Sequence, residues 1–152
     1  PSNGVSATVF ALAVMGSDLY AGGTFALAGG IQASRVARWT GSSWERLGSF
    51  DSNGVNDWVF ALTAIDGDLY VGGWFGQAGG LEANQVARWN GRAWSSVGTG
   101  AANGVNGIVY ELAANGRELI VGGNFGEAGG IVSGSIARAD TAVLPLFADG
   151  FE

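Results

Sequence analysis

The sequence has no cysteine, no histidine and no lysine, so all seven of its basic residues are arginine. These absences exclude thiol and imidazole nucleophiles, histidine-based acid–base catalysis, most zinc sites and Schiff-base lysines. Charged residues make up only 13% of the chain and the net charge is -6. A nucleic-acid partner is not expected, because neutralising a run of phosphates needs many basic residues. We therefore expect no enzyme, no catalytic residue, no cofactor and no bound metal.

Long apolar runs are missing too, since no segment reaches the roughly 18 apolar residues of a membrane span. What the chain does have is glycine, at 28 of its 152 positions, against a usual share of about 7%. Apolar residues make up 47% of the sequence, which is ample material for a folded core.

A unit of fifty residues repeats three times along the chain. The first two units align without a gap and are identical at half of their positions. The repeated motifs are Asn3-Gly4-Val5, Asn53-Gly54-Val55 and Asn103-Gly104-Val105, and the diglycines Gly22-Gly23, Gly72-Gly73 and Gly122-Gly123. We predict one repeat domain over residues 1–152, with units 1–50, 51–100 and 101–152.

Within each unit the pattern is that of short antiparallel strands. Residues 9–14 alternate large and small side chains, which is the period of a strand. Strands are also predicted at 19–25, 36–39 and 44–47, with a glycine-rich loop over 28–30. The first turn falls at Gly16-Ser17 and at Asp66-Gly67, and one position earlier in its unit at Asn115-Gly116. We expect an all-β fold of repeated four-stranded antiparallel blades.

The second unit carries the most specific pattern. Leu69-Tyr70-Val71-Gly72-Gly73 is followed by Val86-Ala87-Arg88-Trp89 and then by Trp94. This pattern resembles the kelch repeat, and it is similar to repeats of large secreted bacterial β-propeller proteins. The resemblance implies a β-propeller of three blades, a half or partial ring, in an extracellular or cell-surface protein.

The third unit departs from the pattern after Arg138. Ala139 stands where the other units have tryptophan, and Leu144 stands at the second tryptophan position. A terminal or edge strand is predicted at 142–147, because Pro145 cannot donate a ladder hydrogen bond. Residues 147–152 resemble a short tail of secreted proteins of Gram-negative bacteria. We interpret this unit as a degenerate C-terminal cap and the end of the chain as genuine.

Three blades would leave two open faces, because closed propellers have about four to eight blades. Exposed faces of this kind mark association sites, so we expect the chain to assemble with copies of itself. Two chains could close a six-bladed ring, or successive chains could form a filament. The chain could instead be the C-terminal part of a longer propeller. The rival functions are a lectin-like or adhesive module that binds glycans and an enzyme at the channel mouth.

Three residues differ from the repeat and are candidate contacts with a ligand or partner. Trp58 and Trp74 could stack on a sugar or a partner chain, or pack between blades. Glu111 stands where Ala11 and Ala61 stand, and could face a channel or remain a solvated carboxylate at the rim.

Other positions are expected to be structural. Each repeated arginine is expected to pair with a repeated carboxylate at Asp18, Asp68 or Glu118, although a charged ring that binds an anion or sugar is the alternative. The loop 51–57 could hold calcium, but an Asn-Gly turn that links blades is favoured. The structural positions are Gly22, Gly23, Phe25, Arg38, Trp39, Trp44, Gly72, Gly73, Phe75, Arg88, Trp89, Trp94, Gly122, Gly123, Phe125 and Arg138.

Overall fold

A computed structural model describes residues 3–142 and 147–148 of the chain. These residues form antiparallel sheets of two to four strands, and their one helical segment is the short 3-10 turn η1 (Gly100–Ala102). The predicted all-β class is confirmed. Within the same residues, no helix has the length and apolar character that crossing a bilayer requires.

Each repeat forms one four-stranded antiparallel sheet whose strands lie in chain order. The first sheet contains β1 (Val9–Met15), β2 (Asp18–Gly23), β5 (Val36–Trp39) and β6 (Trp44–Arg46). The second contains β7 (Trp58–Ile65), β8 (Asp68–Trp74), β11 (Val86–Trp89) and β12 (Trp94–Ser96). The third contains β13 (Ile108–Asn115), β14 (Glu118–Asn124), β17 (Ile136–Asp140) and β18 (Phe147–Ala148). The predicted four-stranded units are confirmed in all three repeats.

The predicted glycine-rich loop is wrong, because each repeat has a short hairpin there. The hairpins are β3 (Leu27–Ala28) with β4 (Ile31–Gln32), β9 (Gln77–Ala78) with β10 (Leu81–Glu82), and β15 (Glu127–Ala128) with β16 (Ile131–Val132). Gly29 and Gly30 form the turn of the first hairpin with φ angles of 55° and 85°. Two successive positive φ angles suit a two-residue hairpin turn, and glycine adopts them without steric cost.

The first turn of the third repeat is also displaced from its predicted place. Asn115 ends β13 and pairs with Glu118, so Gly116 and Arg117 form the turn, as in the other repeats. A shift of one residue would move every side chain of β13 to the opposite face of the sheet. The burial of Val109 and Leu112 therefore outweighs the local preference for an Asn-Gly turn.

The last strand of the third repeat is described only over β18, Phe147–Ala148. Ala139 of β17 pairs with Phe147 of β18, not with Leu144, which the fifty-residue spacing had placed there. Most of the predicted strand, including Leu144 and Pro145, lies outside the described residues, as does the terminal segment 149–152.

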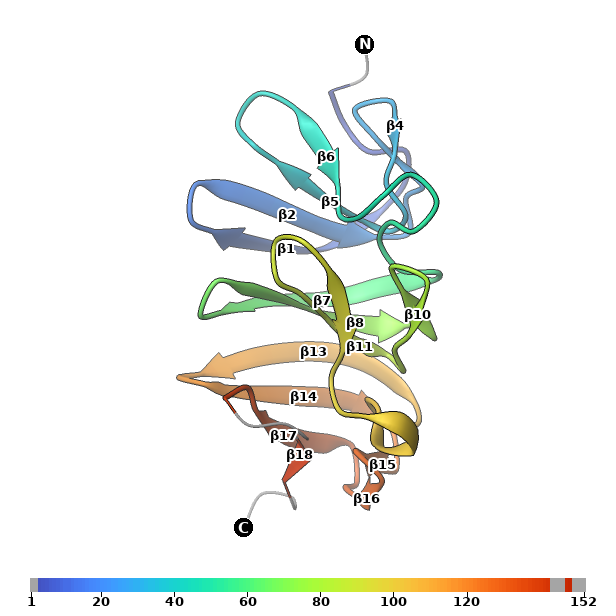
Figure 1. Cartoon of the computed structure of the whole chain (residues 1–152), viewed down its shortest axis with the longest axis vertical. Helices are drawn as coiled ribbons and strands as arrows, with labels where there is room; N and C mark the ends of the chain where they lie inside the picture. Colours follow the sequence, from blue (N-terminus) through green and yellow to red (C-terminus); the bar gives the residue numbers. More distant parts are fainter. Residues whose placement is uncertain (1–2, 143–146, 149–152) are drawn as a thin grey trace.

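The three sheets lie one above another along the long axis of the molecule, in the order of the sequence (Figure 1). The first and the third sheet lie at opposite ends of this stack. The first strands of successive sheets, β1, β7 and β13, are in contact. No sheet among the described residues closes into a ring, so the propeller arrangement stays a prediction.

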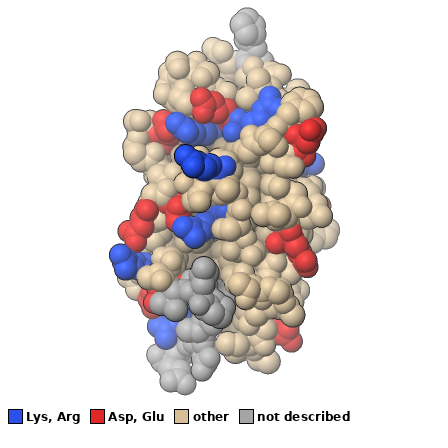
Figure 2. All heavy atoms as spheres, in the orientation of Figure 1, with Lys and Arg blue, Asp and Glu red and all other residues tan. Residues whose placement is uncertain are grey.

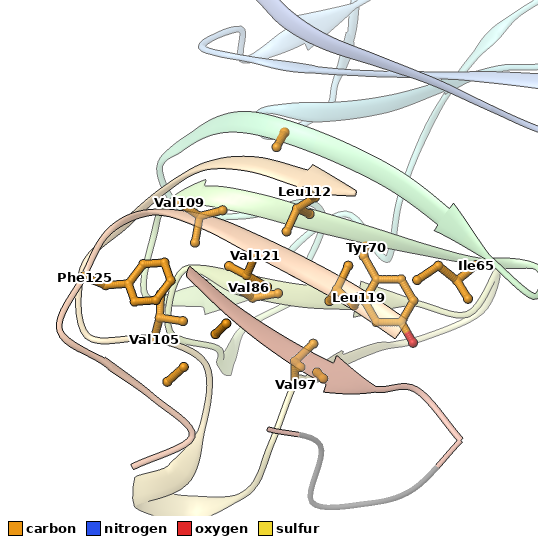
Figure 3. Packing of buried hydrophobic residues seen from close by; sticks show 14 residues of the cluster. Ile65, Tyr70, Val86, Val97, Val105, Val109, Leu112, Leu119, Val121 and Phe125 are labelled. Atoms are coloured by element: carbon orange, nitrogen blue, oxygen red, sulfur yellow. The ribbon is translucent and has the colours of Figure 1, made fainter. Parts of the chain in front are cut away.

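Apolar side chains fill the space between neighbouring sheets. Figure 3 shows the second of these junctions, where Ile65, Tyr70 and Val86 of the second sheet face Val109 and Leu112 of the third. An equivalent cluster joins the first two sheets and includes Tyr20, Val36, Val59, Leu62, Leu69 and Val71. The core is thus divided into layers, each shared by two repeats.

Candidate functional site

Each internal junction depends on a glycine that faces a valine of the next repeat. A Cβ atom added to Gly22 would collide with Val59, and one added to Gly72 would lie 2.6 Å from Cγ1 of Val109. Both valines are fully buried. The second glycine of the pair has a different role, since a Cβ on Gly73 would collide with a carbonyl of its own sheet. The diglycine therefore permits close packing both within a repeat and between repeats.

The first sheet exposes the side chains that the other two sheets bury at this junction. Leu12 is 62% exposed, whereas its counterparts Leu62 and Leu112 are 9% and 8% exposed. Val9 and Val14 of the same strand are exposed as well. We call this outward surface of β1, formed by Val9, Leu12 and Val14, the leading face. Among the described residues it is an apolar sheet face without a neighbour, whereas the counterparts of Val9 and Leu12 in the other two sheets are buried.

At the other end of the stack, the third sheet presents the opposite half of a junction. Ile136 is 47% exposed, whereas Val36 and Val86 at the same position are fully buried. Among the described residues, only its strand partner Glu111 lies within 4 Å of a Cβ atom added to Gly122. We call this surface the trailing face and define it by Glu111, Asn115, Ile120, Gly122 and Ile136. It is more polar than its counterparts, which have alanine or apolar residues at the first two positions.

The Asn-Gly-Val motif links successive repeats, as predicted for the loop 51–57. Asn53 is buried, accepts a hydrogen bond from the backbone N–H of Ser34 at 2.8 Å and donates one to the carbonyl of Phe50 at 2.9 Å. Asp57 accepts from the N–H of Trp58 at 2.9 Å. Because these side-chain oxygens serve backbone donors, the linking role is confirmed. A shallow hollow lined by Asn53 has a counterpart lined by Asn103 at the next junction.

A column of aromatic rings runs along the first strands of the three sheets. The ring centroids of Phe10 and Phe60 are 5.3 Å apart, and those of Phe60 and Tyr110 are 5.7 Å apart. Each ring belongs to the extra residue of a β-bulge, which turns its side chain away from the ladder. Phe10 and Tyr110, at the two ends of the column, are exposed.

Trp58 and Trp74 extend this column to one side. They are directly paired residues of β7 and β8, with ring centroids 6.3 Å apart at an interplanar angle of 86°. Trp58 also lies 6.2 Å from Phe60. Both tryptophans are exposed, so they do not form the core between repeats. The structure thus brings together two of the three candidate contact residues on an aromatic surface.

Glu111, the third candidate, lies elsewhere. It pairs with Gly122 on the trailing face, where its side chain is exposed. Within the described residues, no three acidic residues are grouped so that they could hold a metal ion.

The predicted arginine–carboxylate pairs form in all three repeats, between the second and third strands of the four-stranded sheet. The shortest distances are 2.8 Å for Arg38 and Asp18, 2.6 Å for Arg88 and Asp68, and 3.1 Å for Arg138 and Glu118. Burial raises the pKa of the Tyr20 and Tyr70 phenols, which lie beside the first two pairs. These tyrosines are therefore protonated at neutral pH and act as packing residues.

The repeated tryptophans, which were expected to be structural, form cross-strand pairs. Trp39 and Trp44 are paired residues of β5 and β6 with ring centroids 5.5 Å apart, and Trp89 and Trp94 repeat this arrangement at 5.4 Å. The indole N–H of Trp94 donates to the carbonyl of Leu47 at 2.7 Å, which ties the second repeat to the first.

Sequence reasoning missed the aromatic column and the residues of the leading face. The signal for the column was present, since Phe10, Phe60 and Tyr110 stand fifty residues apart. The leading face carries no such signal, because Val9 and Leu12 match the residues that later repeats bury. Val9 and Leu12 are exposed because, among the described residues, no sheet precedes the first one in the stack.

Charged side chains are scattered over the face that Figure 2 shows, several of them in pairs of opposite sign, and uncharged atoms make up most of it. This distribution offers no large field of a single sign. The sequence matches no protein-family model and no curated protein.

Proposed function

We propose that the protein is a non-enzymatic structural and interaction module that assembles with copies of itself through the two open ends of its stack of repeats. The main support is the exposure of Leu12 on the leading face, where Leu62 and Leu112 are buried by a preceding repeat. Removing such a side chain from water stabilises association by about 1.5–3 kcal/mol. Covering this face with another surface therefore lowers the free energy of the chain.

The finer architecture proposed here is that of a kelch-like, partial β-propeller of three blades, with the third as a degenerate cap. The repeated four-stranded sheets and the contacts between their first strands support it. An extracellular or cell-surface location belongs to the same proposal, and the resemblance to repeats of secreted bacterial propellers supports it.

The absolute mass of the protein in solution tests this function. Light scattering over a range of concentrations should give a dimer or larger assembly for the unchanged chain. Leu12→Ser should reduce the mass to that of a monomer of 15.4 kDa. Leu81→Ser is the matched control, because Leu81 is similarly exposed but lies on the small hairpin of the second repeat. A chain that stays monomeric at every concentration would overturn the proposal.

A second candidate function is the binding of glycans by the aromatic surface around Trp58 and Trp74. The observation that favours it is the exposure of both rings on paired strands, in contact with a third ring, Phe60. Aromatic rings held in a fixed arrangement offer flat apolar surfaces at little cost in conformational entropy.

A further inference from the structure

We infer that copies of the chain join head to tail through a contact built like the two internal junctions, with Asn3–Val5 of one copy seated on Ser133–Ser135 of the preceding copy. This inference rests on the proposed function. It adds the direction in which the copies join and the residues that form the contact between them. Three features of the internal junctions carry it: a backbone clasp, an interlock of glycine with valine, and the column of aromatic rings.

The clasp consists of two hydrogen bonds to one residue of the preceding repeat. Asn53 accepts from the N–H of Ser34 at 2.8 Å, and Val55 donates its own N–H to the carbonyl of Ser34 at 3.0 Å. The same two bonds recur at Asn84, at 3.2 and 3.1 Å. Gly134 is the equivalent of Ser34 and Asn84 in the third repeat.

Both halves of a further clasp are already in place at the ends of the stack. The carbonyl of Gly4 accepts from the N–H of Gly29 at 2.8 Å, as the equivalent groups do in the other repeats, so the first repeat itself positions Asn3 and Val5. Within the described residues, the N–H of Val5 and both backbone groups of Gly134 have no hydrogen-bond partner. The donors and acceptors therefore match those of the internal clasp.

The shapes of the two ends are complementary as well. A Cβ atom on Gly54 would collide with the carbonyl of Ser34, whereas Gly4 has no atom within 4 Å of this position. Gly72 is covered by Val109, whereas no described residue of another repeat covers Gly122. Val9 and Leu12 of a second copy thus find above Gly122 the space that Val109 and Leu112 occupy above Gly72 inside the chain.

The aromatic column can continue across the same contact. Its spacings of 5.3 and 5.7 Å join equivalent rings of successive repeats, and its exposed ends are Phe10 and Tyr110. In the head-to-tail arrangement Tyr110 of one copy lies next to Phe10 of the following copy. Tilted aromatic pairs of this kind contribute about 0.5–1.5 kcal/mol beyond their buried area.

Two residues of the trailing face make this contact weaker than the internal ones. Glu111 replaces the alanines Ala11 and Ala61, and Asn115 replaces Met15 and Ile65. Placing a carboxylate near a buried interface costs free energy unless it gains a partner. The junction between chains is therefore expected to be reversible, in contrast with the permanent junctions inside the chain.

A head-to-tail contact uses different surfaces of the two copies, so it can propagate. It gives a ring if the rotation between copies closes and a filament if it does not. A contact between two leading faces would instead stop at the dimer.

Two variants that each disable one end provide the test. Leu12→Ser removes the exposed apolar side chain at the centre of the contact that the leading face would make. Gly122→Leu places a side chain on the trailing face, in the space that Val9 and Leu12 of the second copy would occupy. Gly122 is half-buried, and the single chain has room for the added side chain among its described residues. Each variant alone should be a monomer by light scattering, because every contact needs one intact end of each kind. Circular dichroism and thermal melting of both variants check that they are folded.

An equal mixture of the two variants should form a 1:1 dimer and nothing larger. The dimer joins the intact leading face of the Gly122→Leu chain to the intact trailing face of the Leu12→Ser chain. Asn3→Ala in the Gly122→Leu chain should weaken this dimer about tenfold, because the clasp loses an acceptor. If the unchanged chain assembles but Gly122→Leu still does so, or the mixture stays monomeric, the inference is wrong while the proposed function stands. A monomeric unchanged chain overturns both.

Discussion

Val109 occupies the space that a side chain on Gly72 would need, with its Cγ1 atom 2.6 Å from the position of a Cβ atom. The same relationship holds one repeat earlier between Val59 and Gly22. The first glycine of each pair is therefore required less by backbone conformation than by the next sheet, whereas the second is required by the backbone of its own sheet. At Gly122, which no described residue of another sheet covers, the requirement from a next sheet disappears.

Gly72→Ala should destabilise the fold by about 1–3 kcal/mol, because the added methyl group overpacks the junction with Val109. Gly122→Ala is the matched control, since the same change at the third repeat meets no atom of another repeat. Chemical denaturation under monomeric conditions measures both free energies of unfolding. Equal effects at the two positions would show that the glycine serves the backbone of its own sheet.

Asn103→Ala should cost about 1–3 kcal/mol, because it removes a buried side chain that accepts from the N–H of Asn84 and donates to the carbonyl of Glu82. Asn3→Ala, at the equivalent but exposed position, should change the stability of the monomer by less than about 0.5 kcal/mol. Denaturant titrations of the two variants provide the comparison. A large loss for Asn3→Ala in the monomer would contradict the assignment of Asn103 as a link between repeats.

Much of this fold can be predicted from the sequence, because a repeat makes each local pattern visible three times. The strands, the arginine–carboxylate pairs and the tryptophan pairs all follow from residues that recur at the same position. The turn at Gly116 could not be predicted from its own dipeptide, since the burial of Val109 and Leu112 sets the register. The hairpin at Gly29 and Gly30 was mistaken for a loop because its strands are only two residues long.

The candidate site was less accessible to sequence reasoning. Leu12 and Leu62 are the same residue in the same motif, and only their place in the stack makes one exposed and the other buried. Trp58 and Trp74 could be selected because they break the repeat, but their direct pairing depends on the register of β7 and β8. The repeated sequence pattern therefore predicts which side chains are buried inside the stack, but it does not predict which are exposed at the two ends.

Glu111→Ala should strengthen self-assembly, lowering the dissociation constant about tenfold, because it restores the alanine found at Ala11 and Ala61 and removes a charge from the trailing face. Glu127→Ala removes the same charge from an exposed hairpin and should leave the dissociation constant unchanged. Sedimentation velocity measures both. If the two variants assemble alike, net charge rather than the trailing face governs association.

Stability should fall at alkaline pH because of the two buried tyrosines. Burial raises the pKa of Tyr20 and Tyr70 above the usual value of 10.0, while the nearby Arg38 and Arg88 partly oppose this shift. Above about pH 10 the unfolded chain loses these protons before the folded chain does, so the free energy of unfolding decreases as the pH rises. Below about pH 10, both tyrosines are protonated in the folded and the unfolded chain, and their contribution to stability is fully present.

Tyr70→Phe tests this assignment, because phenylalanine keeps the ring and has no proton to lose. Urea denaturation at a series of pH values should show a shallower alkaline decline for the variant, with parallel behaviour of the two proteins from about pH 7 to 9. An unchanged decline above pH 10 would mean that other groups cause it.

Trp58→Ala and Trp74→Ala should each weaken binding of a neutral oligosaccharide up to about tenfold if the aromatic surface binds glycans, because each loses one stacking ring. Calorimetric titration against a panel of neutral oligosaccharides measures this. Phe50→Ala is the control, since Phe50 is an exposed aromatic residue whose ring is covered by Arg46. Neither tryptophan lies on the leading or trailing face as defined, so both variants should assemble like the unchanged chain. Loss of assembly in these variants, without glycan binding by the unchanged chain, would instead identify the tryptophans as contacts between copies.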